Sequence, residues 1–180
     1  AGRTVLSAKF ACPVSGFTID EIEPRLFSFN NPFGACPACD GLGTEMYFDP
    51  ELVIPDASLS LNQGCLSPWA SSSSKYYQQT LDSLAAHYDF ALNKPWDKLS
   101  KQIRQIVLFG SGLDDVEMAY NDGSRSYHIT KPFEGVIPNM ERRWRETDSS
   151  WVRDDLARYQ TVTTCSTCNG ARLKPEALAI

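Results

Sequence analysis

The chain has 180 residues, of which 42% are hydrophobic and 22% charged, a balance typical of a globular protein with a buried core. Its net charge of -5 argues against a protein that coats nucleic acid through bulk charge. No apolar run approaches the roughly 18 residues that span a bilayer, and no charged-then-apolar leader opens the chain. We therefore expect a reducing, cytoplasmic compartment and no membrane contact.

The charged residues are unevenly distributed along the chain. Residues 40–124 carry twelve acidic and five basic side chains, whereas residues 125–158 carry six acidic and seven basic ones. Basic groups are thus concentrated in the later part of the sequence. Because the chain begins at Ala1 without a methionine and stops at Ile180, we expect it to be a piece of a longer protein.

The first forty residues contain a possible strand and an incomplete cysteine motif. Residues 25–34 alternate apolar and polar side chains before Asn-Pro and Gly, which predicts a short strand. Upstream, Cys12-Pro13-Val14-Ser15-Gly16 resembles a Cys-x-x-Cys knuckle in which Ser15 replaces the second cysteine. Since a hydroxyl is a poor zinc ligand beside sulfur, Cys12 is either the remnant of a lost site or a partly buried free thiol.

The pattern Cys-x-x-Cys-x-Gly occurs twice, at residues 36–41 and 165–170. Two residues between cysteines let both thiolates of a tight turn face one ion, and a second such turn completes a four-thiolate shell around zinc. Glycine after each pair permits positive φ where the chain leaves the knuckle. The motif predicts one structural zinc ion held by Cys36, Cys39, Cys165 and Cys168. Two unrelated buried pairs, or disulfides in an oxidising compartment, are the alternatives.

The first half of the intervening segment predicts helices and one strand. Apolar residues recur at helical spacing over Lys75–Phe90, with a preceding serine as the N-cap and Asn93 with Pro95 at the end. Residues 96–105 predict a shorter helix. The apolar run at 106–109, stopped by glycines, predicts a buried strand.

The second half predicts a hairpin followed by two helices. Alternation at residues 116–120 and 125–130 around a Gly-containing turn is typical of a β-hairpin. Amphipathic helices are predicted at about 139–147 and 150–160. The fold class is therefore α+β, a small mixed helix and hairpin insertion domain rooted on a split four-cysteine zinc module.

The sequence does not predict an enzyme. His87 is expected on a helix and His128 in mid-strand, and both are interpreted as structural histidines. The phosphate-loop pattern Gly-x-x-x-x-Gly-Lys-[Ser/Thr] does not occur. The adjacent pairs Asp114-Asp115 and Asp154-Asp155 point apart in a helix or strand, so we interpret them as solvated charge.

A cluster of basic and aromatic residues is the best functional candidate, because guanidinium groups bind phosphates and flat rings contact bases. Its basic members are Arg142, Arg143, Arg145, Lys131, Arg125 and Arg153, and a secondary candidate is Lys75 with Tyr76. The alternative is a solvated helix face whose charges form intrahelical ion pairs, because acidic residues are interleaved at Glu141, Glu146, Asp148, Asp154 and Asp155. Trp144 stands four residues after Met140, a spacing typical of a core position.

Three runs resemble UvrA, the damage-recognition ATPase of the bacterial UvrABC excinuclease in nucleotide-excision repair. They are Glu23–Gly43, Phe133–Val136 with Asn139–Arg143, and Cys165–Leu173. The resemblance implies part of signature domain I in residues 1–43, a DNA-facing insertion domain in residues 44–164, and the return through the second knuckle in residues 165–180. It also implies that the four paired cysteines hold one zinc. Ser15 departs from the family pattern, in which many members have a second cysteine.

The resemblance further implies an ABC-type parent ATPase whose ATP site lies outside this chain, a homodimeric parent and a part in the SOS response. Its partners would be damaged duplex DNA and the UvrB helicase subunit. We therefore expect a DNA-binding, damage-sensing module that contacts the DNA backbone without sequence specificity. The alternative is a protein-interaction module that docks UvrB. A zinc hydrolase is a poor third, because four thiolates leave no coordination position for water.

Overall fold

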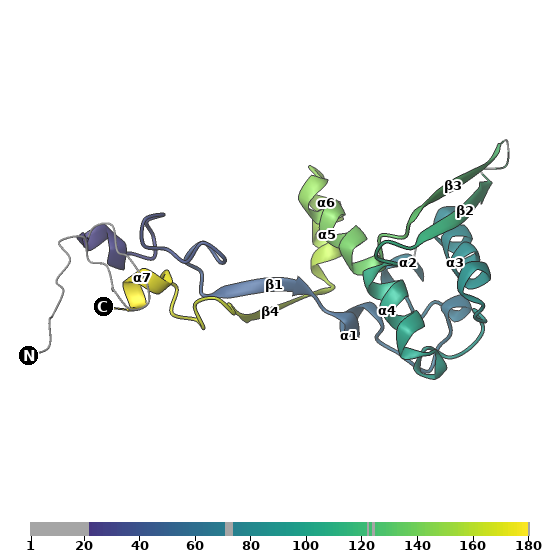
Figure 1. Ribbon diagram of the computed structural model, residues 1–180, viewed down its shortest axis with the longest axis horizontal. Helices are drawn as coiled ribbons and strands as arrows, with labels where there is room; N and C mark the ends of the chain where they lie inside the picture. Colours follow the sequence, from purple (N-terminus) through teal and green to yellow (C-terminus); the bar gives the residue numbers. More distant parts are fainter. Residues whose placement is uncertain (1–21, 71–73, 122, 124, 180) are drawn as a thin grey trace, which may run out of the picture. The chain divides into compact units, whose positions relative to one another are not determined.

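The structure is a computed structural model that describes residues 22–70, 74–121, 123 and 125–179. It divides into two compact units. The cysteine unit comprises Ala1–Tyr47 with Val162–Ile180, and the inserted unit comprises Phe48–Thr161. The chain passes between them along strands β1 (Thr44–Phe48) and β4 (Gln160–Thr164), which form a two-stranded sheet (Figure 1). The Cys12–Ser15 pattern lies outside the described residues.

The cysteine unit contains two short helical segments, η1 (Pro24–Phe27) and α7 (Pro175–Leu178). The strand predicted for residues 25–34 is wrong, because the chain folds back on itself there. Asn31 accepts hydrogen bonds from Phe33 and Ala35, and a Cβ on Gly34 would lie 2.3 Å from the carbonyl oxygen of Leu26. Asn-Pro turn chemistry therefore outweighs the alternating pattern.

The inserted unit is built from helices around one hydrophobic core and a hairpin. Among the described residues, no helix is long and apolar enough to cross a membrane. Its helical segments are α1 (Pro50–Val53), η2 (Leu61–Gln63), α2 (Ser67–Ala70), α3 (Lys75–Tyr88), η3 (Trp96–Lys98), α4 (Lys101–Phe109), α5 (Val136–Glu146) and α6 (Ser150–Ala157). Together with the hairpin they confirm the predicted α+β class.

Helix α3 confirms the predicted amphipathic helix and its serine cap. The Ser74 hydroxyl accepts a hydrogen bond from the backbone N–H of Tyr76. The helix ends at Tyr88, earlier than predicted, because Asp89 adopts the left-handed conformation with φ of 51°. Its buried face includes Leu81 and Leu84.

The strand predicted for residues 106–109 is wrong, because α4 continues to Phe109. The Ser100 hydroxyl caps the helix by accepting from the N–H of Ile103. A short apolar run cannot by itself distinguish a buried strand from a helix face. Gly110 ends the helix with φ of 99°. A Cβ on Gly135 would lie 2.4 Å from the backbone nitrogen of Gly110. These two glycines let the end of α4 approach the start of α5 closely.

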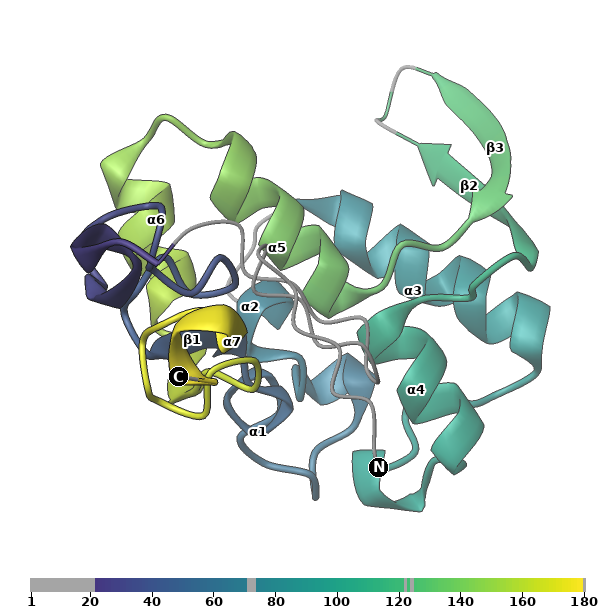
Figure 2. The ribbon, with the colours of Figure 1, turned by 60° about the vertical axis from the view of Figure 1, so that its left-hand side comes forward.

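The predicted hairpin is confirmed as β2 (Asp115–Asn121) paired antiparallel with β3 (Ser126–Pro132). Strand β2 buries alternate residues, whereas β3 is exposed along its whole length. Both views place α3 beside this hairpin (Figures 1 and 2).

The free edge of β2 is bonded to α3 through side chains. The Ser83 hydroxyl accepts the N–H of Ala119 at 3.1 Å. The Gln79 amide donates to the carbonyl of Asn121 at 2.9 Å and accepts its N–H at 3.1 Å. Two side chains thus replace part of a third strand and hold β2 on the helix.

Helices α5 and α6 confirm the two predicted amphipathic helices with shifted ends. Helix α5 begins at Val136, because Pro138 is tolerated in a first helical turn. Met140 is fully buried, and the half-buried Trp144 packs edge-on against Phe48 with ring centroids 6.5 Å apart. The core interpretation of Trp144 is therefore correct.

Candidate metal centre and candidate nucleic-acid interface

The four paired cysteines converge in the cysteine unit. Their sulfur atoms all lie within 4.8 Å of one another, and all four side chains are buried. The Sγ atoms of Cys36 and Cys165 are 3.9 Å apart, and those of Cys39 and Cys168 are 3.8 Å apart. A tetrahedron with Zn–S bonds of about 2.3 Å has edges of about 3.8 Å, so the sulfur cage fits zinc. A disulfide needs a separation of about 2.05 Å, and these cysteines are free, which excludes the disulfide alternative in this structure.

Each knuckle turns through two residues of positive φ directly after its second cysteine. In the first knuckle these are Asp40 (49°) and Gly41 (75°), and in the second they are Asn169 (50°) and Gly170 (84°). Asp, Asn and Gly are the residues that adopt this conformation most easily. The positive φ that the sequence predicted for the glycine of each motif is therefore present in the structure.

Backbone N–H groups point at the sulfur atoms. Gly43 donates to the Sγ of Cys39 at 3.2 Å, and Arg172 donates to the Sγ of Cys168 at 3.4 Å. A metal-bound thiolate accepts hydrogen bonds from N–H groups oriented in this way. The polypeptide thus prepares two of the four sulfurs for a cation.

The two knuckles also bond to each other in a reciprocal way. Cys36 donates its N–H to the carbonyl of Arg172 at 2.9 Å, and Cys165 donates its N–H to the carbonyl of Gly43 at 3.0 Å. Arg172 and Gly43 each stand seven residues after the first cysteine of their knuckle. The four-cysteine cluster is therefore pseudo-twofold, and each half completes the hydrogen bonding of the other.

The sulfur cage has an uneven proton affinity. The Glu45 carboxylate and burial raise the pKa of the Cys165 thiol to about 12. Burial also acts to raise the pKa of Cys168, but hydrogen bonds from Arg172 and from the other thiols outweigh it and lower that pKa to about 7. Because a metal requires thiolates, zinc would displace protons here, and its affinity would rise with pH.

Arg172 is a site residue that sequence reasoning missed. Its Nε donates to the carbonyl of Gly41 at 2.7 Å, and its guanidinium lies 3.6 Å from the ring centroid of Phe29. A Cβ on Gly43 would lie 2.8 Å from the Cγ of Arg172, so the glycine leaves the space that the arginine fills. The sequence signal that could have identified Arg172 is its position seven residues after Cys165, which matches the position of Gly43 after Cys36.

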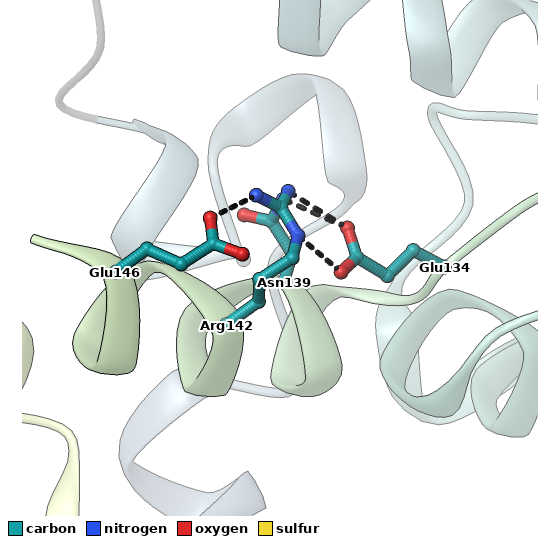
Figure 3. Close-up of polar contacts among 4 residues, drawn as sticks. All are labelled: Glu134, Asn139, Arg142 and Glu146. Atoms are coloured by element: carbon teal, nitrogen blue, oxygen red, sulfur yellow. Dashed lines mark hydrogen bonds and ion pairs between the residues drawn. The ribbon is translucent and has the colours of Figure 1, made fainter.

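In the inserted unit, Arg142 is bound by two carboxylates (Figure 3). Its Nε and Nη2 donate to Glu134 at 2.8 and 3.1 Å, and its Nη1 donates to Glu146 at 2.9 Å. Asn139 adds a hydrogen bond of 3.1 Å to Glu134. The hydrogen bond from Arg142 is the main cause that lowers the pKa of Glu134. For this arginine the ion-pair interpretation of the sequence describes the structure.

The other arginines of this region differ in their surroundings. Arg143 is half-buried and donates to the hydroxyl of Tyr77 at 3.4 Å. Arg145 is exposed and makes no ion pair with any residue that the structure describes. Arg153 donates to the carbonyl of Thr147 at 2.7 Å and lies 5.9 Å from the ring centroid of Trp144. Arg143 and Arg145 therefore keep more capacity for an external anion than Arg142 does.

Four tyrosines, here named the tyrosine cluster, connect α3 to the hairpin. The rings of Tyr76 and Tyr120 stack at 4.8 Å with an interplanar angle of 6°. Tyr127 lies 5.5 Å from Tyr120 across the hairpin, and Tyr77 meets Tyr76 edge-on at 5.5 Å.

Several predicted DNA-binding residues lie around this cluster. Tyr76, Lys131 and Glu134 line one small cavity of about 40 Å³. Through Tyr77 and Glu134, Arg143 and Arg142 belong to the same neighbourhood. Lys75 lines a neighbouring hollow with Tyr76. Arg153 lies instead on α6, and Arg125 follows the hairpin tip.

The histidines lie where the sequence predicted, and each faces an acidic residue. The Nε2 of His87 on α3 is 3.5 Å from Asp114, and the Nδ1 of His128 on β3 is 3.0 Å from Glu117. Neither belongs to a metal-binding group among the described residues. Cys65 is buried, and burial raises the pKa of its thiol to about 11, so it is poorly reactive.

Comparison with known proteins points to one family. The family model of the UvrA DNA-binding domain matches residues 49–158. The chain is 59% identical over 178 residues to the UvrABC system protein A of Brucella abortus and 58% identical to that of Bradyrhizobium diazoefficiens. Each match covers 99% of this chain but 18% of the relative. The crystal structure of UvrA2 from Deinococcus radiodurans matches with a TM-score of 0.67 and 23% identity, over 85% of this chain and 20% of that one.

Proposed function

The chain belongs to the UvrA DNA-binding domain family, and from this membership we propose that it is the DNA-contacting, damage-sensing module of a UvrA-like excinuclease subunit in nucleotide-excision repair. The observation that carries the proposal is the position of the basic and aromatic residues. The tyrosine cluster, Lys131 and Arg143 all lie within the matched residues 49–158 and meet on one part of the inserted unit.

We propose that this unit contacts the DNA backbone without reading its sequence. Lys75, Lys131 and Arg145 are exposed, and among the described residues the one side-chain hydrogen bond of Arg143 is a long one to a neutral hydroxyl. Cations in this state bind phosphates and fix the position of a protein on the duplex. Damage would then be sensed through the deformability of the duplex rather than through base-edge hydrogen bonds.

Arg142, Arg153 and Arg125 are given lesser roles in this proposal. Arg142 is already neutralised by two carboxylates, so any phosphate would compete with Glu134 and Glu146. We propose that its main task is to fix the start of α5, which positions Arg143 and Arg145. Arg153 and Arg125 remain candidate contacts at the margins of the surface.

We propose one structural zinc ion held by Cys36, Cys39, Cys165 and Cys168. Bound zinc would supply a cross-link between the two knuckles, and the sulfur cage would leave no position for a reactive water. Supporting this are the buried sulfurs, their tetrahedral spacing and the N–H groups directed at them. Metal analysis of the purified chain should give about one zinc per molecule.

At the level of the whole protein, we propose a bacterial, cytoplasmic, homodimeric ABC-type ATPase that works with a UvrB-like helicase. The chain spans about 18% of the length of the curated relatives it matches, so ATP binding would use segments outside it. Within the chain we propose that residues 44–164 are the DNA-facing insertion, residues 1–43 and 165–180 its attachment to the ATPase, and that none of these segments is catalytic.

A salt titration tests the backbone-contact proposal. The affinity of the chain for two unrelated duplexes is measured by fluorescence anisotropy at several salt concentrations. The triple variant Lys75→Gln, Lys131→Gln, Arg143→Gln should lower the slope of log K against log salt by up to about 0.9 per lost contact, equally for both duplexes. A control triple that removes the same charge elsewhere, Lys94→Gln, Lys98→Gln and Lys101→Gln, should leave the slope unchanged.

Two outcomes would contradict this function. Equal loss of slope in both triple variants would mean that only net charge matters, and a strong preference for one duplex sequence would mean base readout. The alternative function, docking of the helicase subunit, predicts instead that residues 1–180 retain a UvrB-like protein in a pull-down. That retention, with no affinity for duplex, would favour docking.

A further inference from the structure

A hollow of about 290 Å³ lies between the start of α3 and the outer part of the hairpin. Its lining residues are Ser74, Lys75, Tyr76, Gln79, Tyr120, Asn121 and Tyr127. The lining that the structure describes therefore consists of three aromatic rings, two carboxamides, one serine and one lysine. None of these groups is acidic.

The aromatic walls of the hollow are partly open to solvent. Tyr76 is 46% exposed and Tyr127 is 45% exposed, whereas Tyr120 between them is only 4% exposed. The hydroxyl of Tyr120 is bonded to Thr80 at 3.1 Å and to the sulfur of Met118 at 3.2 Å. The ring of Tyr120 is thus held in place, with the ring of Tyr76 stacked on it and the ring of Tyr127 tilted beside it. Tyr76 and Tyr127 each have exposed ring surface that a further planar group can contact.

The hollow is also rigid on its inner side. Gln79 bonds both the N–H and the carbonyl of Asn121, which fixes the end of β2 against α3. A preorganised aromatic surface loses little conformational entropy when a ligand stacks on it. Compared with scattered surface tyrosines, these rings are therefore better prepared to bind a planar ligand by stacking.

We propose that this hollow receives a single nucleobase that has left the stack of the duplex, with Lys75 binding the adjoining phosphate. The proposal rests on the DNA-contact function and extends it. Every base has a π-face, so stacking on tyrosine accepts any base, as a sensor of varied damage requires. An unpaired or damaged base costs least to unstack, so the hollow would favour sites where pairing is weakened.

Three duplexes of one sequence test the proposal with the whole chain. One is fully paired, one carries a single bulged 2-aminopurine, and one carries an abasic tetrahydrofuran in place of that bulged base. The last two share backbone flexibility and differ by the base, so the ratio of their affinities isolates stacking. We expect roughly 5- to 100-fold tighter binding with the base present and quenching of the 2-aminopurine emission.

Variants assign the effect to the hollow. Tyr76→Leu and Tyr127→Leu should each bring the affinity ratio toward one, whereas Tyr76→Phe should retain it. Lys75→Gln should weaken binding to all three duplexes and leave the ratio unchanged. Tyr47→Leu, which removes an exposed tyrosine of the cysteine unit, is the matched control. If Tyr76→Leu does not fold, Tyr127→Leu decides, because β3 is exposed along its length.

The outcomes separate the two proposals. Binding of the paired duplex with a ratio near one in the unmodified chain, or a ratio unaffected by both leucine variants, overturns the base-binding hollow alone. If the chain binds none of the three duplexes, the DNA-contact function fails and the hollow falls with it.

Discussion

Arg142 makes the densest set of polar contacts on α5, so replacing it separates a structural role from a DNA-binding one. In Arg142→Gln, Glu134 loses two hydrogen bonds and Glu146 loses one. The variant should therefore destabilise the inserted unit. Arg145→Gln, on the same helix, removes an equal charge from a side chain without an ion pair among the described residues and is the control.

The expected loss in Arg142→Gln is about 1 kcal/mol. A bidentate pair exceeds the 0–1 kcal/mol of an ordinary surface ion pair, but the side chains are 44% and 38% exposed, so solvent screening reduces the gain. For a unit of this size, about 1 kcal/mol corresponds to a fall in Tm of roughly 3–5 °C. Arg145→Gln should change Tm by less than about 1 °C.

The loss should also depend on pH. Arg142 lowers the pKa of Glu134 below its ordinary 4.5, so folding is stabilised by this pair above that value. As pH falls through the lowered pKa, Glu134 becomes protonated in the folded state and the stabilisation disappears. The Tm gap between the unmodified chain and Arg142→Gln should therefore be constant near neutral pH and shrink in acid.

Differential scanning calorimetry over a pH series measures this gap, and anisotropy measures duplex affinity of the same samples. We expect Arg142→Gln to lose stability with little change in the salt slope of DNA binding, and Arg145→Gln to do the reverse. A stable Arg142→Gln protein with a reduced salt slope would refute the clamp and make Arg142 a phosphate contact. A Tm gap independent of pH down to full protonation of Glu134 would refute the ion pair as its cause.

Three further predictions concern the two units separately. Chelation, or Cys168→Ser, should remove the zinc ion that we propose and abolish the thermal transition of the cysteine unit. The transition of the inserted unit should remain, because the cysteine cluster is separate from the main core. Loss of both transitions together would contradict this. Gly41→Ala should reduce zinc retention, since its Cβ would lie 2.1 Å from a backbone oxygen. The control Gly112→Ala has a similar φ but open space around its Cβ, so it should lower the free energy of unfolding by only about 1 kcal/mol. Equal zinc retention in the two variants would argue against a steric cause. Gln79→Ala should speed hydrogen exchange at the amide of Asn121, the last residue of β2, as measured by NMR. Replacing the exposed neighbour, Gln78→Ala, should leave this exchange rate unchanged. An unchanged rate in Gln79→Ala would contradict the role of Gln79 in holding β2 on α3.

Local patterns predicted the parts of the molecule that depend on local chemistry. The Cys-x-x-Cys-x-Gly spacing predicted which four sulfurs meet, because both the turn and the ligand chemistry are set within six residues. The alternation around residues 121–124 predicted the hairpin, but its register, which pairs Tyr120 with Tyr127, was not predicted.

Features that depend on packing between distant segments were not predictable in this way. The apolar run at 106–109 is compatible with strand or helix, and only its continuity with the capped start at Ser100 makes it helical. The stack of Tyr76 on Tyr120 requires α3 to lie along β2, which no local pattern specifies. Arg172 likewise gains its role only when the second knuckle faces the first.

The junction between the two units has a consequence for how this family can vary. Strand β1 ends beside the start of β4, where Asp49 donates its N–H to the carbonyl of Tyr159 at 2.9 Å. For the two cysteine knuckles, the segment from Asp49 to Tyr159 is one loop whose ends are held together. The entropy of closing a loop grows only logarithmically, so doubling its length costs about 0.6 kcal/mol. The sulfur cage can therefore tolerate inserts of very different size and fold, and the inserted unit is free to be exchanged, shortened or enlarged while its attachment stays the same.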